Sequence, residues 1–362
     1  MRRLLALLVG ISSLFLVEVV VRLVDGPPPA PTRVYAVNPP GTRFLRVDGD
    51  NLHADFQSNS PNAVIPREPP RRRVAVIGGS SVHIGSAVDD PEFPQLLRKK
   101  INADVMNLGA PGLDSADHVR QVEELLDDEW TAIVMYAGHN DFGNAFFLQR
   151  YAGAQGAVNA WTRQVLERSA TYVLLRETLM PAGGRTNMNP RPDMPAMTDE
   201  QVALAEADLA TNYERMAWLC KRAGTTLVIA VPAVSWTEAP IQTSCDRSPC
   251  AYQLHQQASA RLAQQGARAS AVEATKLGDV FRAAGDADRQ LLHVTLRAQQ
   301  IMRDIALREG LPLVDADRDL PVAAGADVPD PELFLDHVHF TARGHREMAT
   351  LLAGPLAKLL DG

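Results

Sequence analysis

The stretch VAVIGGSSVHIG, residues 74–85, decides the fold of this chain. Four apolar residues, Val74 to Ile77, run directly into two glycines and two serines. A short continuous apolar run that ends at turn residues is typical of a strand buried on both faces. The stretch therefore predicts a buried strand that stops at a sharp turn. That turn is a phosphate cradle, a structural bend or the position of a nucleophile.

Strand-like and helical segments alternate from residue 73 onward. The runs RVAVIG, ADVMN, TAIVMY, TLVIAV and LPLVD are separated by helical stretches such as SADHVRQVEELLDD. Alternation of this kind predicts an α/β fold with a central, doubly wound parallel sheet that helices cover on both faces.

The chain divides into three regions. Residues 1–25 form a candidate membrane anchor, and residues 26–72 are a Pro-rich linker and an irregular lead-in. Residues 73–362 are the α/β domain, and two stretches at about 142–200 and 251–310 interrupt its alternation. We expect these insertions to be extra helices packed on the sheet, with a lid or a partner surface as the alternative.

Composition limits the classes of function. A hydrophobic content of 46% with 22% charged residues is sufficient for a large buried core. The net charge of −7 provides no basic face for a phosphate backbone, so we expect no nucleic-acid partner.

The amino terminus has the features of a membrane span. Arg2 and Arg3 precede the apolar residues 4–24, which at about 1.5 Å per residue reach across the roughly 30 Å of a hydrocarbon core. Glu18 and Arg22 stand one helical turn apart and can pair. The positive-inside rule then predicts a single-pass anchor with the domain on the periplasmic or extracellular side. A cleaved secretory signal remains the alternative.

The three cysteines agree with an outer location. Cys245 and Cys250 bracket the short polar turn DRSP, so a disulfide bond between them is easily closed in an oxidising compartment. Cys220 lies on an apolar helical face and is expected to be a buried thiol.

Known phosphate-binding motifs do not fit the turn after Ile77. A P-loop needs a lysine after its glycines, and a dinucleotide fingerprint needs G-x-G-x-x-G; residues 78–86 contain neither. The G-x-S-x-G pentapeptide of the α/β-hydrolases is also absent from the chain.

Residues suited to acyl transfer follow the first three strands of the predicted sheet. Ser80 follows the first strand, Gly112 the second and Asn140 the third, and ligands of open parallel sheets bind beyond these carboxyl ends. Acyl transfer needs a nucleophile and donors aimed at the developing oxyanion. Asp336 and His339, in LFLDHVHFTARGH, provide the remaining base and its orienting carboxylate.

These pieces resemble the four sequence blocks of the SGNH/GDSL hydrolases. The resemblance is to membrane-anchored members whose first block reads G-G-S-[ST], and it covers about residues 73–360. It implies a three-layer, flavodoxin-like α/β/α sandwich and hydrolysis of ester or acyl groups without a cofactor or metal. By this resemblance Ser80 is the nucleophile, Asp336 and His339 complete the triad, and the Ser80 N–H, Gly112 and Asn140 form the oxyanion hole.

Two departures from the family pattern stand out. Gly79 occupies the position of the aspartate in the commoner first block, and the insertions make the gap from Asn140 to Asp336 long. The residues that adjoin the motifs are expected to be structural or to support the site from behind: Ser81, His83, His139 and Asp141.

Three functions remain from the sequence, and a metal site is an alternative for the residues around His339. A serine esterase acting on an outward-facing ester of carbohydrate or lipid is favoured, and an O-acyltransferase with the same triad is its nearest alternative. A binding or assembly protein would use the insertions and tolerate loss of Ser80. A metal site built on Asp336, His337 and His339, with His345 nearby, would leave Ser80, Gly112 and Asn140 without a role.

Overall fold

The structure is a computed structural model. The residues it describes are 13, 16–20, 22–23, 43–54, 64–67, 72–83, 91–147, 169, 171, 196–241, 250–265, 271–289 and 292–361. Among these residues, no helix combines the length and the apolar character that crossing a membrane requires. Most of the predicted anchor, residues 4–24, lies outside the described part of the chain.

A parallel sheet of five strands forms the centre of the domain, in the order β5-β4-β6-β7-β8. This is the order of a flavodoxin-like fold, with the first strand in second place and the connections reversing direction beside it. All four strand pairs are parallel, and the strand predictions are confirmed. The strands are β4 (Arg72–Gly78), β5 (Ala103–Asn107), β6 (Ala132–Tyr136), β7 (Thr226–Val231) and β8 (Leu313–Asp315).

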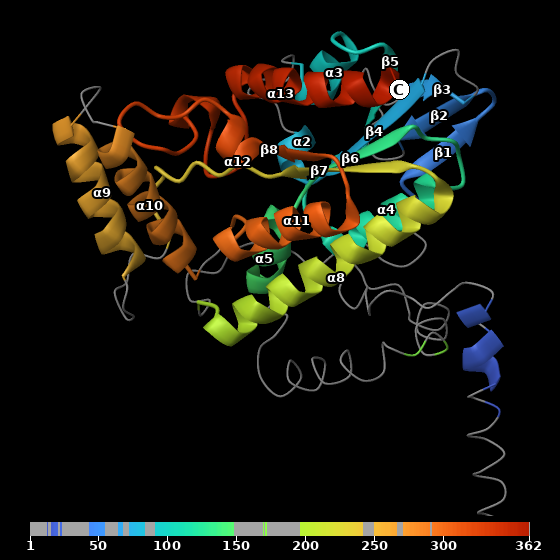
Figure 1. Cartoon of the computed structure of the whole chain (residues 1–362), viewed down its shortest axis with the longest axis horizontal. Helices are drawn as coiled ribbons and strands as arrows, with labels where there is room; N and C mark the ends of the chain where they lie inside the picture. The colour runs from blue at the N-terminus through green and yellow to red at the C-terminus, as the bar shows by residue number, and fades with distance from the viewer. Residues whose placement is uncertain are drawn as a thin grey trace, which may run out of the picture.

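Helices cover both faces of this sheet, so the predicted three-layer sandwich is confirmed (Figure 1). Side chains of β4 alternate between the layers: Val74 and Val76 face α3 (Phe93–Arg98) and α13 (Ala342–Asp361), while Ala75 and Ile77 face the opposite side. On that opposite side lie α4 (Ser115–Leu125), α5 (His139–Phe147), α8 (Asp199–Ala223) and α11 (Leu296–Glu309).

The longest of these helices, α8, begins and ends where its sequence signals predict. The Thr198 side chain accepts from the Gln201 N–H and the Gln201 side chain accepts from the Thr198 N–H, a complete capping box. Gly224 ends the helix in the left-handed region at φ +73°, which a glycine adopts without steric cost.

The lead-in contains ordered strands that the sequence analysis missed. Three antiparallel strands, β1 (Leu45–Asp48), β2 (Asn51–Ala54) and β3 (Val64–Pro66), form a second sheet. Gly49 and Asp50 make the two-residue turn between β1 and β2, and Gly-Asp at such a turn is a hairpin signal. The Glu124 carboxylate of α4 accepts from the backbone N–H of Phe44 and Leu45, which ties this small sheet to the sandwich.

The second predicted insertion is shorter than residues 251–310. Helices α9 (Ala251–Gln265) and α10 (Ala271–Ala287) pack on each other at one end of the sandwich (Figure 1). Helix α11, which we expected in the insertion, packs against α8 and β7 within the helical layer. The physical reason is that a parallel strand pair such as β7 and β8 needs a covering crossover helix.

The first predicted insertion, at about 142–200, is described only in part. Residues 142–147 belong to α5, and residues 196–200 lead into α8. Apart from Ser169 and Thr171, residues 148–195 lie outside the described part of the chain.

The cysteines differ in state. Cys220 is a free, buried thiol of α8, and burial raises its pKa to about 12. Cys250 is disulfide-bonded, whereas Cys245 lies outside the described residues.

Candidate active site

Ser80 lies at the carboxyl end of β4, at the first position of the short helix α2 (Ser80–His83). Pairing with β6 brings Gly78 opposite Tyr136. A Cβ on Gly78 would lie 2.2 Å from the Tyr136 backbone oxygen and 2.4 Å from the Val82 side chain. Only glycine therefore allows this turn, which presents Ser80 partly exposed at the sheet edge. As the first helical residue, Ser80 has a backbone N–H without an acceptor inside its helix.

Three residues of the predicted triad are in hydrogen-bond contact. The Nε2 atom of His339 is 2.8 Å from the Ser80 Oγ, although the two residues are 259 positions apart. The Nδ1 atom of His339 is 2.6 Å from the Asp336 Oδ2. An ionised carboxylate can only accept, so Nδ1 carries the ring proton and Nε2 accepts from the Ser80 hydroxyl.

Asp336 is stabilised as a carboxylate by its own loop. Partial burial works to raise the pKa of its carboxyl group, but hydrogen bonds from the His339 ring and from the backbone N–H of Val338 and His339 outweigh it. The net result is a pKa well below the usual range of an aspartate. Asp336 is therefore ionised throughout the physiological pH range and can balance a positive charge on His339.

Residues Phe334–Phe340 form a closed turn that we call the acid loop. Phe334 and Phe340 make an antiparallel bridge, and the Leu335 N–H donates to the His339 carbonyl at 2.7 Å. Both phenylalanines are buried, with ring centroids 5.2 Å apart. The sheet and α13 thus hold the base of the acid loop, which projects Asp336 and His339 toward Ser80.

Asn140 lies beside the nucleophile turn. A Cβ on Gly79 would be 2.4 Å from the Asn140 Nδ2, so glycine at position 79 leaves room for this carboxamide. One Nδ2–H donates to the Leu113 carbonyl at 2.8 Å, which leaves the second amide hydrogen for another acceptor.

Gly112 lies in the loop after β5, at φ +78°, where a side chain would be strained. Its carbonyl accepts from the Asn144 Nδ2 at 3.1 Å, and the neighbouring Leu113 carbonyl accepts from Asn140. The structure therefore brings the loop after β5 against Asn140, and Asn140 against the Ser80 turn. The predicted oxyanion residues meet at one edge of the sheet.

Asp141 has a structural role. Its carboxylate accepts from the backbone N–H of Ser115 at 3.2 Å and from the Ser115 hydroxyl, and Asn212 of α8 donates to that hydroxyl at 2.7 Å. These contacts tie the start of α5 to the start of α4. They therefore fix the position of the segment that carries Gly112 relative to the segment that carries Asn140.

His139 lies behind the triad as a neutral base. Burial lowers its pKa to about 3, with further contributions from His293 and His339. Its Nδ1 accepts from the Val294 N–H at 3.3 Å. The ring therefore stays uncharged at physiological pH and adds no competing positive charge beside His339.

The other residues that adjoin the motifs support the site from behind. Ser81 is buried, and His83 has its Nδ1 3.2 Å from the Glu92 Oε1. His345, part of the alternative metal reading, accepts from the Phe93 N–H at 3.2 Å on the α3 side of the sheet. Within the described ranges, no group of three or more His, Cys, Asp or Glu side chains could hold a metal ion.

The sequence analysis missed Asn144, and it named His337 only as part of the alternative metal site. Asn144 holds the Gly112 loop and stands four residues after Asn140, a spacing that places both on one helix face. His337 holds the acid loop through its backbone and its ring. No local signal separates His337 from a solvated loop residue, because its partners come from a distant segment.

Comparison with family models identifies the family of this chain. Residues 76–347 match the family model of the GDSL-like lipase/acylhydrolase family, which is more than half of the chain. A search of curated proteins finds no match.

Several solved structures match this chain at low sequence identity. They include a GDSL-like lipase from Bacteroides thetaiotaomicron, with 14% identity, a TM-score of 0.40 and coverage of 80% of this chain and 89% of that one. An alpha/beta hydrolase from the metagenome of Lake Arreo has 15% identity and a TM-score of 0.40, and covers 80% and 97%. A variant of an acetyl xylan esterase from Geobacillus stearothermophilus has 12% identity and a TM-score of 0.37, and covers 80% and 94%.

The family match includes Ser80, Gly112, Asn140, Asp336 and His339 within its bounds. This chain belongs to the GDSL-like lipase/acylhydrolase family and is an SGNH hydrolase that acts on ester bonds.

Proposed function

We propose that the protein is a serine esterase that forms an acyl-enzyme on Ser80. The observation that carries the proposal is the continuous hydrogen-bonded series from the Ser80 hydroxyl through the His339 ring to the Asp336 carboxylate. A hydroxyl is a weak nucleophile unless an adjacent base takes its proton, and His339 is that base.

The reaction has two halves. As the Ser80 Oγ attacks the ester carbonyl carbon, its proton passes to the His339 Nε2 and the carbonyl oxygen becomes an oxyanion. Collapse of this intermediate breaks the bond to the alcohol oxygen, which takes the proton from Nε2 and leaves. Water then attacks the acyl-enzyme by the same route, and the acid and the free Ser80 hydroxyl are released.

The oxyanion is stabilised by donors already in place. We assign this role to the backbone N–H of Ser80, the backbone N–H of Gly112 and the second amide hydrogen of Asn140. Donors fixed before the reaction need no reorganisation when the charge develops. The contacts of Asn140 with Leu113 and of Asn144 with Gly112 support this assignment, because they restrain both donors.

We further propose that a single-pass amino-terminal anchor places the enzyme on the outer side of a membrane. Pairing of the Arg22 Nε with the Glu18 Oε1 at 2.7 Å supports it, since the pair neutralises both charges of the span. The other oxygen of Glu18 accepts from the Ser169 hydroxyl and the Thr171 N–H. The disulfide bond at Cys250 favours an oxidising compartment. An outward-facing ester of carbohydrate or lipid is the substrate class that fits this location.

The test is a screen of short-chain acyl esters and acetylated glycans with the full chain in non-ionic detergent. Wild type should release the free acid, while Ser80→Ala should be inactive. An organophosphonate should label Ser80 in wild type but not in His339→Ala. Addition of a sugar alcohol distinguishes hydrolysis from acyl transfer by the product formed. Turnover by Ser80→Ala at the wild-type rate would exclude the proposed mechanism.

A further inference from the structure

The segment that follows β7 is held at nearly every backbone position. We call residues Pro232–Ala239 the β7 extension. Side chains from four other elements bind its backbone. The contacts are Gln299 Nε2 to the Pro232 carbonyl at 2.8 Å, the Ala233 N–H to the Tyr136 hydroxyl at 3.2 Å, the Val234 N–H to the Asp317 Oδ1 at 3.4 Å, and His255 Nε2 to the Thr237 carbonyl at 2.7 Å.

The β7 extension makes two hydrogen bonds with one residue of the acid loop, His337. The Ser235 N–H donates to the His337 carbonyl at 2.9 Å, and the His337 Nε2–H donates to the Ala239 carbonyl at 3.0 Å. His337 lies between Asp336 and His339 in the chain. Any shift of His337 therefore moves the carboxylate and the imidazole of the triad directly.

Helix α9 reaches the β7 extension through a buried histidine. The His255 Nε2–H donates to the Thr237 carbonyl, and its ring packs edge-on against Phe281 of α10 with centroids 5.5 Å apart. The two helices of the insertion thus place this donor together.

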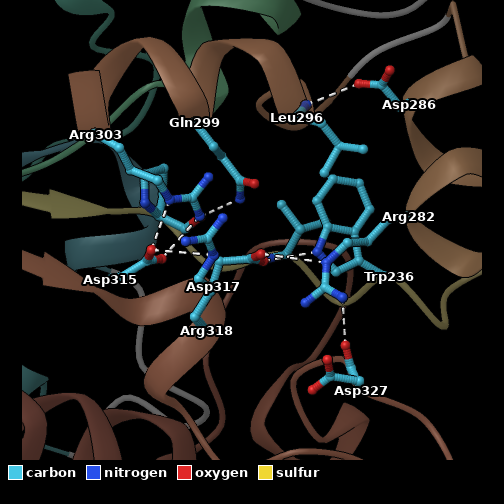
Figure 2. Close-up of polar contacts among 12 residues, drawn as sticks. Trp236, Arg282, Asp286, Leu296, Gln299, Arg303, Asp315, Asp317, Arg318 and Asp327 are labelled. Carbon is cyan, nitrogen blue, oxygen red and sulfur yellow. Dashed lines mark hydrogen bonds and ion pairs between the residues drawn. The ribbon is translucent and has the colours of Figure 1, made fainter. Parts of the chain in front are cut away.

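Helix α10 reaches the same segment through Asp317 (Figure 2). The Arg282 Nε lies 3.7 Å from the Asp317 Oδ2, while the Asp317 Oδ1 accepts from the Trp236 Nε1–H at 2.7 Å. Burial raises the pKa of the Asp317 carboxyl, and the nearby Arg282 guanidinium acts in the opposite direction.

The ring of Trp236 also packs directly on the α10 backbone. A Cβ on Gly285 would lie 2.7 Å from that ring, so only glycine allows this close approach. Trp236 is 2% exposed, which means that α10 and the β7 extension meet without intervening solvent.

From these contacts we propose that the α9–α10 insertion is a positioning element of the active site: through the β7 extension it sets the place of His337, and thereby of Asp336 and His339. This inference rests on the proposed function, because it assigns catalytic roles to the two acid-loop residues. His255, Trp236 and His337 are positioning residues that do not touch the substrate.

The experiment compares the donor-deleting variants His255→Ala and His337→Ala with the rescue variants His255→Gln and His337→Gln. The glutamine amide nitrogen lies near the position of the histidine Nε2 and can donate to the same carbonyl. His53→Ala is the matched control, since His53 of β2 is partly exposed like His337 and makes no contact with the acid loop. The substrate is p-nitrophenyl acetate, and the full chain is used in detergent.

Loss of either donor should lower kcat by between about 10-fold and 10²-fold with KM unchanged, as expected for misplaced catalytic groups. The far-downfield proton resonance of His339 Nδ1–H should broaden or shift, and each glutamine should restore both signals. His53→Ala should match wild type. A merely structural role would lower the melting temperature without this change in kcat and in the resonance.

Wild-type kcat in folded His255→Ala would overturn the role of the insertion, and wild-type kcat in His337→Ala would overturn the coupling to the acid loop. If His255→Ala does not fold, His255→Phe fills the space beside Phe281 without a donor and is measured in its place. Ser80→Ala is measured in parallel. An active Ser80→Ala protein would refute the proposed function, whereas an inactive one with fully active histidine variants would refute only the positioning role.

Discussion

Asp336 and His339 are bonded to each other twice: the Asp336 Oδ2 lies 2.6 Å from the His339 Nδ1, and the Asp336 Oδ1 accepts from the His339 backbone N–H at 2.9 Å. The carboxylate therefore fixes both the ring and the peptide that carries it. The orientation of the catalytic base is therefore set by two hydrogen bonds within one loop, which leads to the first prediction.

Asp336→Asn should keep the fold and lose most of the activity. An asparagine retains the shape and one acceptor, but its amide group favours the wrong tautomer of His339, so kcat should fall by on the order of 10⁴. Steady-state kinetics with circular dichroism as a fold control would check it. A loss confined to KM would contradict the role assigned to Asp336.

Asn140→Ala should reduce kcat by on the order of 10² to 10³ with a smaller effect on KM, because one oxyanion donor is removed. Asn144→Ala is the matched control: it removes the contacts to the Gly112 carbonyl and to Asp114, but it removes no proposed donor to the oxyanion. The kcat of Asn144→Ala should fall less. Equal losses in the two variants would argue for a positioning role of Asn140.

Gly79→Ala should displace the Asn140 carboxamide, because the new side chain would point toward it. The new Cβ would lie 2.4 Å from the Asn140 Nδ2, so the carboxamide must move and kcat should fall by about 10-fold or more. Gly354→Ala in α13 is the control, since its Cβ meets nothing within 4 Å. That control should keep full activity, although its stability should not rise, because a side chain before Pro355 disfavours the helical conformation.

Stability should fall when the pH drops from about 6.5 toward 3, in part because of His139. Its pKa is about 3 in the folded protein, whereas an unfolded histidine titrates near 6.5, so in this window the unfolded state binds more protons. Each such group adds a slope of about 1.4 kcal/mol per pH unit to the free energy of unfolding.

The variant His139→Asn tests this contribution, because its side-chain oxygen can still accept from the Val294 N–H. Urea denaturation at several pH values should give a shallower slope than wild type below pH 6.5 and the same slope above pH 7. Parallel curves below pH 6.5 would contradict the buried, neutral state of His139.

Cys220 should resist alkylation in the folded protein. Cys220 is 1% exposed and the pKa of its thiol is raised to about 12, so little thiolate exists to react. Mass spectrometry should find Cys220 modified by iodoacetamide only after unfolding, and peptides of the unreduced protein should join Cys245 to Cys250. Rapid native labelling of Cys220 would show that α8 opens locally.

Much of the fold and the site could be predicted from local sequence because each feature depends on few neighbours. Strands buried on both faces need continuous apolar runs, so the sequence alone predicts the strands β4, β5, β6 and β7. The turn at Gly78 needs glycine for steric reasons, which directs attention to Ser80. Asp336 and His339 are close in sequence, so their contact is local.

Other features depend on packing between distant segments. The β1–β3 sheet was missed although Gly49 and Asp50 signal a hairpin, because three short strands carry a weak pattern until α4 holds them. The place of α11 within the helical layer depends on the crossover that joins β7 to β8, not on its own composition.

The sequence by itself determined the fold class, the family and the five residues of the proposed site. Strand burial, the sterics of the nucleophile turn and the residue types needed for acyl transfer each depend on residues close together in the sequence. Only the tertiary structure decided that His337 is held by Ser235 and Ala239, and that His255, Arg282 and Trp236 connect the insertion to that point. The reason is physical: a hydrogen bond across about a hundred residues exists only after the sheet and its helices have brought both partners together, and neither partner alone carries a signal of it.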